Sequence, residues 1–521
     1  MALAIGHKSF EREVQRAHAE GRPTPTVAIV GGGLSGLATA IQLVRAGVRN
    51  FTIIEQSDGV GGTWRDNSYP GAACDVPSHL YSFSFAPKTD WSRRFAEQPE
   101  ILSYAEDLVD RYHLTPHLRL GTTVRSATYN EASGTWQLSL HDASGDHELS
   151  ADTVVFACGQ LNRPHVPDVE GLGSFAGPTW HSAQWDHDVD LAGQRVAVVG
   201  TGASAIQFVP PVASAAASTT IFQRSPNYIG PKKDHPYGPA SRRALRRWAL
   251  LRSAYRWWTY WTLEIRWLWF RRDSLAGRQL QSLLRKGIRD EVVNDRLPAH
   301  AVIPDYPLGC KRVLISNDWY PTLLRANVTV VDSPVTRIEP DAIVTADGIR
   351  HPADILIYGT GFVTTAFLSH IPVTGVDGQR LSNAWTDGAH AYLGSAVAGF
   401  PNCYVLYGPN TNLGHNSILF MVERQLNLVL QALALQTQAT TGTGTAAVAV
   451  RMAAYERDDR HTQRQMDKTA WSANCTSWYK NAAGRITNNW PTWTVRFWWN
   501  TLRIRSDDFE VIAPEGDEQP V

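Results

Sequence analysis

The fold of this chain is decided by residues 26–36, which read Thr-Val-Ala-Ile-Val-Gly-Gly-Gly-Leu-Ser-Gly. The first five, Thr26–Val30, are mostly β-branched, which predicts a buried parallel strand. An apolar helical stretch follows over Leu37–Ala46. A strand, a glycine-rich turn and a helix in this order are typical of a dinucleotide-binding fold, in which N–H groups at the start of the helix hold a pyrophosphate.

Three glycines and one acid give this first motif its specificity. Gly31 is expected to form the tight turn, Gly33 to let the backbone approach the pyrophosphate, and Gly36 to let the helix pack on the strand. The next strand is predicted over Phe51–Ile54 and ends at Glu55, 19 residues after Gly36. A carboxylate at this place accepts hydrogen bonds from the ribose hydroxyls of an adenosine that lacks a 2′-phosphate.

A second motif of the same kind begins at a predicted strand over Arg195–Val199. Its turn carries alanine in the third place, a permitted variant, so that the motif positions are Gly200, Gly202 and Ala205. The following strand, Thr219–Phe222, ends in Gln223-Arg224 and not in an acid. A guanidinium binds a 2′-phosphate bidentately, whereas a carboxylate repels it, so this site is predicted to take NADP. The alternative is that Arg224 is a solvated charge at the end of a strand.

Composition narrows the class of protein. The chain has 521 residues, 43% of them hydrophobic, which is enough for two or three domains with cores of their own. It carries 49 basic and 49 acidic residues, so no nucleic-acid partner is expected. Its five cysteines are scattered without CxxC spacing. This predicts reduced thiols in a cytoplasmic protein and argues against a disulfide framework, a metal site or a disulfide reductase.

The elements predicted along the chain place one nucleotide-binding domain inside another. A strand pattern at Asp152–Ala157 continues the first domain, and a strand at Tyr404–Tyr407 is expected to return to it. The predicted fold class is therefore α/β, with two Rossmann-like dinucleotide-binding domains and a helical insertion. The expected boundaries are 1–157 for the first part of the first domain, 158–375 for the second domain with its insertion near 235–300, and 376–521 for the rest of the first domain.

The segment 244–272 holds six tryptophans, among nine arginines counted from Arg242 to Arg272. Charged residues interrupt it, and no run of the chain is expected to be long enough to span a membrane. Met1–Arg22 also lacks the apolar stretch of a signal peptide. Two interpretations of 244–272 stay open: an interfacial helix in peripheral contact with a membrane, or a helical subdomain whose tryptophans pack over a substrate site. We favour the second.

Two further stretches carry a resemblance to a known family. Residues 61–75 read GGTWRDNSYPGAACD, and residues 175–186 read FAGPTWHSAQWD. Together they resemble both sequence signatures of the type I (class B) Baeyer–Villiger monooxygenases, over roughly residues 25–500. The matching positions are Gly61, Gly62, Trp64, Tyr69, Pro70, Gly71, Asp75, Phe175, Gly177, His181, Trp185 and Asp186. The family often has arginine at the position of Ala73, and residues 475–490 diverge from its best-known members.

The resemblance implies an FAD- and NADPH-dependent reaction with dioxygen. NADPH reduces FAD, and the C4a-peroxyflavin formed with dioxygen attacks an apolar ketone to give an ester or a lactone. One alternative is an N- or S-oxygenating flavin monooxygenase, although these usually lack the ending Trp185-Asp186 and tend to carry an amide at Asp75. Another is a flavoprotein without catalytic activity that binds membranes or partners through the segment 244–272.

The resemblance also assigns roles to individual residues. Arg312 would be the cation beside the flavin, with Asp75 holding it in place, and Lys311 would join Arg224 on the NADP 2′-phosphate. The alternative for Lys311-Arg312 is an ordinary basic pair on the surface. His181, in the linker between the nucleotide domains, would support domain movement, with Trp185 and Asp186. Trp478 would lie near the nicotinamide, unless it is simply a core residue. Further cofactor contacts are expected at Gly62, Thr63, Trp64, Asp75, Tyr81 and Ser225.

Overall fold

The first of two five-stranded parallel sheets contains the strand of the opening motif. The computed structural model describes residues 4–441, 444–475 and 477–512. In the strand order β19-β7-β1-β2-β3, all neighbours in this five-stranded sheet are parallel. The strands are Cys403–Val405, Thr153–Phe156, Val27–Val30, Phe51–Ile54 and Leu118–Arg119, in the same order. The late strand β19 thus pairs with β7, which confirms the predicted return of the chain to its first sheet.

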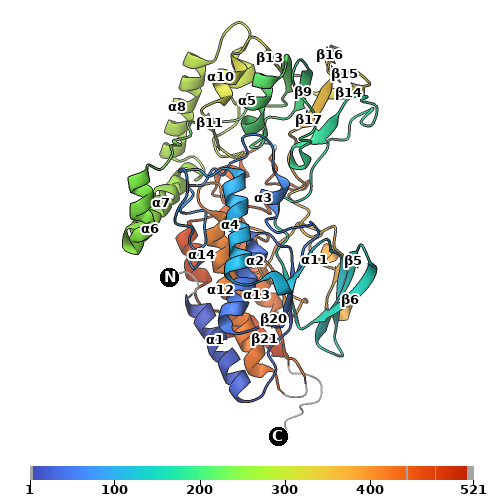
Figure 1. The fold of residues 1–521 in the computed structure, drawn as a ribbon, viewed down its shortest axis with the longest axis vertical. Helices are drawn as coiled ribbons and strands as arrows, with labels where there is room; N and C mark the ends of the chain where they lie inside the picture. Colours follow the sequence, from blue (N-terminus) through green and yellow to red (C-terminus); the bar gives the residue numbers. More distant parts are fainter. Residues whose placement is uncertain (1–3, 442–443, 476, 513–521) are drawn as a thin grey trace.

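Helix α2 packs on strands β1 and β2 of this first sheet, and it lies in a group of helices with α1, α4, α12 and α14 (Figure 1). Helix α12 packs against α1, α2 and α14, and α2 also contacts α4. The helix predicted from Leu37 begins three residues earlier, at Leu34, because the turn after β1 enters the helix directly. The bounds are Ala4–Ala19 for α1, Leu34–Ala46 for α2, Gln98–Arg111 for α4, Ile418–Ala439 for α12 and Thr494–Asn500 for α14.

The second parallel sheet lies at the other end of the molecule (Figure 1). Its five strands have the order β13-β10-β9-β17-β8, with α5 (Ala205–Ala215) and α10 (Trp319–Leu323) packed beside it. The predicted strand Arg195–Val199 is confirmed residue for residue as β9. The others are β13 (Val328–Val331), β10 (Ser218–Phe222), β17 (Ile355–Tyr358) and β8 (Thr179–His181).

Two smaller sheets flank these cores, and both are antiparallel except where β18 runs parallel to β4. One has the order β18-β4-β5-β6, and the other the order β14-β15-β16. Strand β18 pairs with β4, so the chain has already come back to the first half at residue 373. The bounds are Val373–Thr374, Thr123–Asn130, Thr135–Asp142 and Gly145–Ala151 in the first sheet, and Val335–Glu339, Ala342–Thr345 and Arg350–Pro352 in the second.

A helical insertion separates the short strands β11 (Ile229–Gly230) and β12 (Leu314–Ile315), which pair with each other. It consists of α6 (Pro239–Arg247), α7 (Ala249–Glu264), a 3₁₀ turn over Ile265–Trp269 and α8 (Leu275–Glu291). The interpretation that its tryptophans pack over a substrate site is wrong for four of the six. Trp267 is buried and Trp269 half-buried, whereas at least half of the surface of each of the others is exposed: Trp248, Trp257, Trp258 and Trp261.

Two other expectations need correction. By length and composition α12 could cross a membrane, although no such run was expected; however, 83% of its most apolar window is buried, as in the core helix of a globular protein. The prediction of reduced thiols is wrong for Cys310 and Cys475, which form a disulfide. The spacing rule could not foresee this bond, because it joins residues 165 positions apart. Cys74, Cys158 and Cys403 are free.

Candidate active site

The first glycine-rich turn forms a cradle that a side chain would fill. Gly31 has a φ of +110°, and a Cβ atom there would lie 2.8 Å from the carbonyl oxygen of Ala157. A Cβ atom at Gly36 would lie 1.9 Å from the carbonyl oxygen of Gly31, so helix α2 approaches β1 as closely as backbone allows. Gly33 faces Gly62, since a Cβ atom on Gly62 would lie 3.1 Å from the Cα atom of Gly33. This glycine-only approach fits the pyrophosphate of a dinucleotide.

Glu55 is fixed at the end of β2 by the backbone. Its carboxylate accepts hydrogen bonds from the N–H of Gly32 at 2.6 Å and of Ser57 at 2.8 Å. A carboxylate has about four lone-pair sites, so two remain for ribose hydroxyls. Close by, Asp66 has its pKa raised to about 6, first by burial and second by repulsion from Glu55. Both acids line the same cavity.

This cavity has a volume of about 560 Å³ and gathers most of the residues predicted for the first cofactor. Its wall combines the ends of β1, β2 and β7 with Ala203 and Ser204 from the turn of the second motif. The predicted site residues that line it are Gly31, Gly33, Glu55, Gly62, Thr63, Trp64, Asp75, Tyr81 and Arg312. The cavity therefore joins the first nucleotide motif to residues beside the second.

The pair Arg312–Asp75 lies in this cavity. The Nη2 atom of Arg312 donates a hydrogen bond to Oδ2 of Asp75. The two side chains are 29% and 32% exposed, so both are reached from the cavity. The charge of Asp75 raises the pKa of Arg312 above its ordinary value. A fixed cation of this kind stabilises negative charge that develops next to it, at no cost of reorganisation.

Two tyrosines near Arg312 were missed by sequence reasoning. Tyr407 follows β19 and lines the cavity, and Tyr479 follows Trp478. Burial raises the pKa of Tyr479 to about 12 and also raises that of Tyr407, so both stay protonated donors. The hydroxyl of Tyr407 donates to Oδ1 of Asn412 at 2.8 Å. Both residues lie far from Arg312 in the sequence, and only the tertiary fold brings them close to it. For this reason the sequence motifs did not assign them to the site.

The turn of the second motif is built like the first. Gly200 has a φ of +107°, and a Cβ atom there would lie 2.4 Å from the carbonyl oxygen of Gly359. At Gly202 a Cβ atom would meet that oxygen only at 3.9 Å, which leaves the turn open to a ligand. Ala205 begins helix α5 and is buried. The helix start and the open turn fit a second pyrophosphate.

Three polar residues gather beside this turn. The Nζ atom of Lys311 donates to the hydroxyl of Ser225, and it lies 4.6 Å from the ring centroid of Tyr306. Burial first, and the charge of Arg224 second, lower the pKa of Lys311. Arg224 is exposed and forms no ion pair within the described ranges 4–441, 444–475 and 477–512. Lys311 and Arg224 are thus neighbouring cations, and Arg224 forms no ion pair with an acid of the described residues. Such a pair fits a phosphate.

The supporting residues lie outside the cavity. His181 ends β8, buried, with its ring 5.6 Å from that of Phe362, which does line the cavity. Its Nδ1 atom accepts from the N–H of Ala183, and burial lowers its pKa. Trp185 packs on Phe208 of α5 at 5.3 Å. The carboxylate of Asp186 accepts from the N–H of Asp188.

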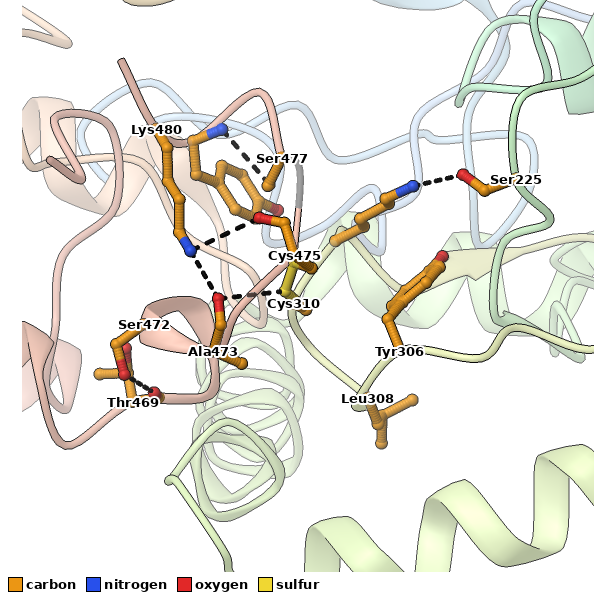
Figure 2. Close-up of a disulfide and its surroundings, with 12 residues drawn as sticks. Ser225, Tyr306, Leu308, Cys310, Thr469, Ser472, Ala473, Cys475, Ser477 and Lys480 are labelled. Carbon is orange, nitrogen blue, oxygen red and sulfur yellow. Dashed lines mark hydrogen bonds between the residues drawn. A yellow bond between two sulfur atoms is a disulfide. The ribbon is translucent and has the colours of Figure 1, made fainter. Parts of the chain in front are cut away.

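The disulfide ties the Arg312 segment to the end of the chain. Cys310 precedes Lys311 and Arg312, and Cys475 lies three residues before Trp478. Figure 2 shows Ser225 and Tyr306 on one side of this bond and Lys480 on the other. The half-buried Trp478 packs on Tyr479 with ring centroids 4.2 Å apart. In the described part of the chain, no group of three or more potential ligands could hold a metal ion.

Comparison with known proteins assigns this arrangement to a class. Residues 24–374 match the flavin-binding monooxygenase-like family, and the chain belongs to it. It is 41% identical to a Baeyer–Villiger monooxygenase of Pseudomonas aeruginosa, over 91% of this chain and 90% of that one. It is 40% identical to a Baeyer–Villiger monooxygenase of Streptomyces coelicolor, over 94% and 93% of the two chains.

Solved structures agree with these relatives. A closed cyclohexanone monooxygenase superposes with a TM-score of 0.83 at 25% identity, covering 94% of this chain and 99% of that one. A complex of OTEMO with FAD and NADP gives 0.81 at 26% identity, covering 94% and 100%. The protein is thus an FAD- and NADPH-dependent flavin monooxygenase that performs Baeyer–Villiger oxygen insertion.

Proposed function

We propose that this monooxygenase inserts oxygen beside the carbonyl of an apolar ketone, with Arg312 as the catalytic cation. The ion pair between Arg312 and Asp75 inside the cavity carries the proposal. Reduced flavin supplies the activated oxygen when FAD and NADPH are bound. Arg312 then stabilises the negative charge that passes to the substrate oxygen, and Asp75 keeps the guanidinium in position.

An apolar substrate fits the remaining wall of this cavity. That wall includes the apolar side chains Val76, Ile371, Leu413, Ile418, Leu419 and Val422. Apolar contacts bury a hydrocarbon chain, and they exclude the water that competes for the reacting atoms.

The two cofactors are proposed to divide the chain as follows. Residues 1–157 and 376–521 hold FAD, and residues 158–375 hold NADPH, with the insertion near 235–300. The pairing of β19 with β7 supports the split arrangement of the FAD part. Lys311, Arg224 and Ser225 are proposed to bind the 2′-phosphate of NADPH, because they gather beside the open turn at Gly202.

Isotope labelling tests the reaction. The FAD-loaded protein is supplied with NADPH, ¹⁸O₂ and a panel of cyclic and long-chain ketones, with a sulfide and a tertiary amine alongside. We expect an ester or lactone that carries one ¹⁸O atom, formed in step with NADPH consumption. If only the sulfide or the amine is oxygenated, the assignment of a ketone substrate is wrong. We also propose that the enzyme is cytoplasmic and contacts a membrane peripherally, because this location would suit a poorly soluble ketone.

A further inference from the structure

Helix α7 buries the apolar side chains Tyr260 and Leu263 but leaves most of its large apolar side chains exposed, which is unusual for a helix of a globular protein. Positions at a helical spacing form an outward stripe that is apolar and exposed. The exposed fractions reach 87% for Leu250, and they lie between 43% and 62% for the other large side chains around it: Trp248, Leu251, Trp257, Trp258, Trp261 and Ile265. Large apolar side chains gathered in this way on an exposed surface mark an interaction site.

The inward face of α7 carries the charged residues instead. Arg256 donates to the carbonyl oxygens of His79 at 2.7 Å and Ser82 at 2.8 Å. Glu264 is fully buried and accepts from the N–H of Thr494 at 2.6 Å. These bonds fix the rotation of the helix, so the tryptophans cannot turn inward without leaving buried charges unpaired. The exposure of the apolar stripe is therefore a fixed property of the fold.

A basic patch borders the stripe. Helix α6 carries four exposed arginines, and none of the four forms an ion pair within the described residues: Arg242, Arg243, Arg246 and Arg247. Residues 239–272 contain nine arginines and a single acidic residue, Glu264, in a chain whose formal net charge is zero. Figure 1 shows α6 and α7 together at the left edge of the molecule, away from β5 and β6.

We propose that the surface formed by α6 and the outer face of α7 docks on a lipid bilayer that contains anionic headgroups. Tryptophan and leucine would enter the interfacial region, while the arginines of α6 contact the headgroup phosphates. A second copy of this chain is the poorer occupant. A twofold contact through the same surface would bring the two arginine clusters onto one interface, and the single acidic residue of 239–272, Glu264, is buried and would not neutralise them.

The inner face of α7, opposite the docking surface, contacts segments that line the cavity. The loop that Arg256 holds contains Tyr81, which lines the cavity. Tyr260 on the inner side of α7 lies 5.1 Å from the ring of Phe420, next to the cavity residues Ile418 and Leu419. A ketone dissolved in the bilayer would thus enter close to the flavin site. This delivery rests on the proposed function, whereas the docking does not.

Flotation of the FAD-loaded protein with vesicles tests the docking. Vesicles of phosphatidylcholine alone are compared with vesicles that also contain phosphatidylglycerol, at low and high salt. We expect binding to the anionic vesicles at low salt and much weaker binding at high salt, because salt screens exposed charges. Absence of flotation with both compositions would overturn the proposal.

Two variants locate the surface. In the first, Trp257, Trp258 and Trp261 are replaced by glutamate; in the second, the four arginines of α6 are replaced by alanine. Removing three interfacial tryptophans should weaken vesicle binding roughly a hundredfold or more, and removing four basic charges should weaken it at least ~tenfold. FAD content and NADPH oxidation show that each variant is folded.

Ile349→Glu is the matched control. Ile349 is 54% exposed, but it lies on the turn before β16, in the small sheet β14-β15-β16. It should float like the unmodified protein. Unchanged binding of the tryptophan variant would refute the proposal, as would a dimer that dissociates in that variant without any binding to vesicles. Loss of ketone oxidation with intact flotation would count against the proposed function only.

Discussion

Arg312 donates a hydrogen bond to Asp75 from 237 positions further along the chain. The two residues come from segments associated with different nucleotide motifs, yet they meet in one cavity. Arg312→Ala should lower the rate of ester formation about 10²–10³-fold, since it removes a preorganised cation from developing negative charge. Ester formation and NADPH oxidation are measured separately, and oxidation should continue with release of hydrogen peroxide.

Arg49→Ala is the control for this change, because Arg49 is exposed, lies outside the cavity and bonds only to the carbonyl oxygens of Val44 and Val48 among the described residues. It should leave ester formation nearly unchanged. Asp75→Asn keeps the shape of the acid but removes its charge, so a loss of roughly ten- to a hundredfold is expected. Equal rates for Arg312→Ala and the unmodified enzyme would contradict the catalytic role of Arg312.

The second cofactor should be selected by Arg224 and Lys311. Replacing either with alanine removes a charged donor to the 2′-phosphate, worth roughly ten- to a hundredfold in binding. The KM for NADPH should rise by that factor, while the KM for NADH changes little. Steady-state kinetics with both nucleotides measure this difference. The exposed Arg337 on β14 provides the control, and a parallel rise for NADH would mean that the two residues do not contact the phosphate.

The disulfide should be visible by thiol counting. Protein denatured without reductant should show three reactive thiols, and protein denatured after reduction should show five. Cys475→Ser should lower the free energy of unfolding by about 2–5 kcal/mol, because the bond closes a long loop. Denaturant titration measures this loss. A count of five thiols without reductant would show that the bond does not form.

Asp66 should make the stability of the FAD-free protein depend on pH. Its pKa is raised to about 6 in the fold, so the unfolded chain ionises at lower pH than the folded one. The stability associated with the protonated acid is therefore lost as pH rises from about 4 through 6. Asp66→Asn removes this loss, and its advantage over the unmodified protein should grow across the same window. Unfolding titrations at about pH 4.5, near the lower end of this window, and at about pH 8, above it, measure the advantage of the variant. An advantage independent of pH would contradict the shifted pKa.

Local sequence was sufficient for the central strands of the two large parallel sheets and for their glycine turns. Strands such as Phe51–Ile54 and Arg195–Val199 fall where the β-branched runs predict them, and the glycine turns follow directly. Turn geometry depends on neighbouring residues and on the lack of a Cβ atom, both of which are visible in the sequence. The family signatures also gave the cofactors and the reaction, because they record the residues that such chemistry needs.

Only the tertiary structure decided what distant residues do together. It brought Tyr407 and Tyr479 to Arg312, and it joined Cys310 to Cys475, which no spacing rule could foresee. It also turned the tryptophans of α7 outward, because Arg256 and Glu264 found buried partners on the inner side. The spacing of apolar residues shows that a helix is amphipathic, but the direction of its apolar face depends on the groups against which it packs.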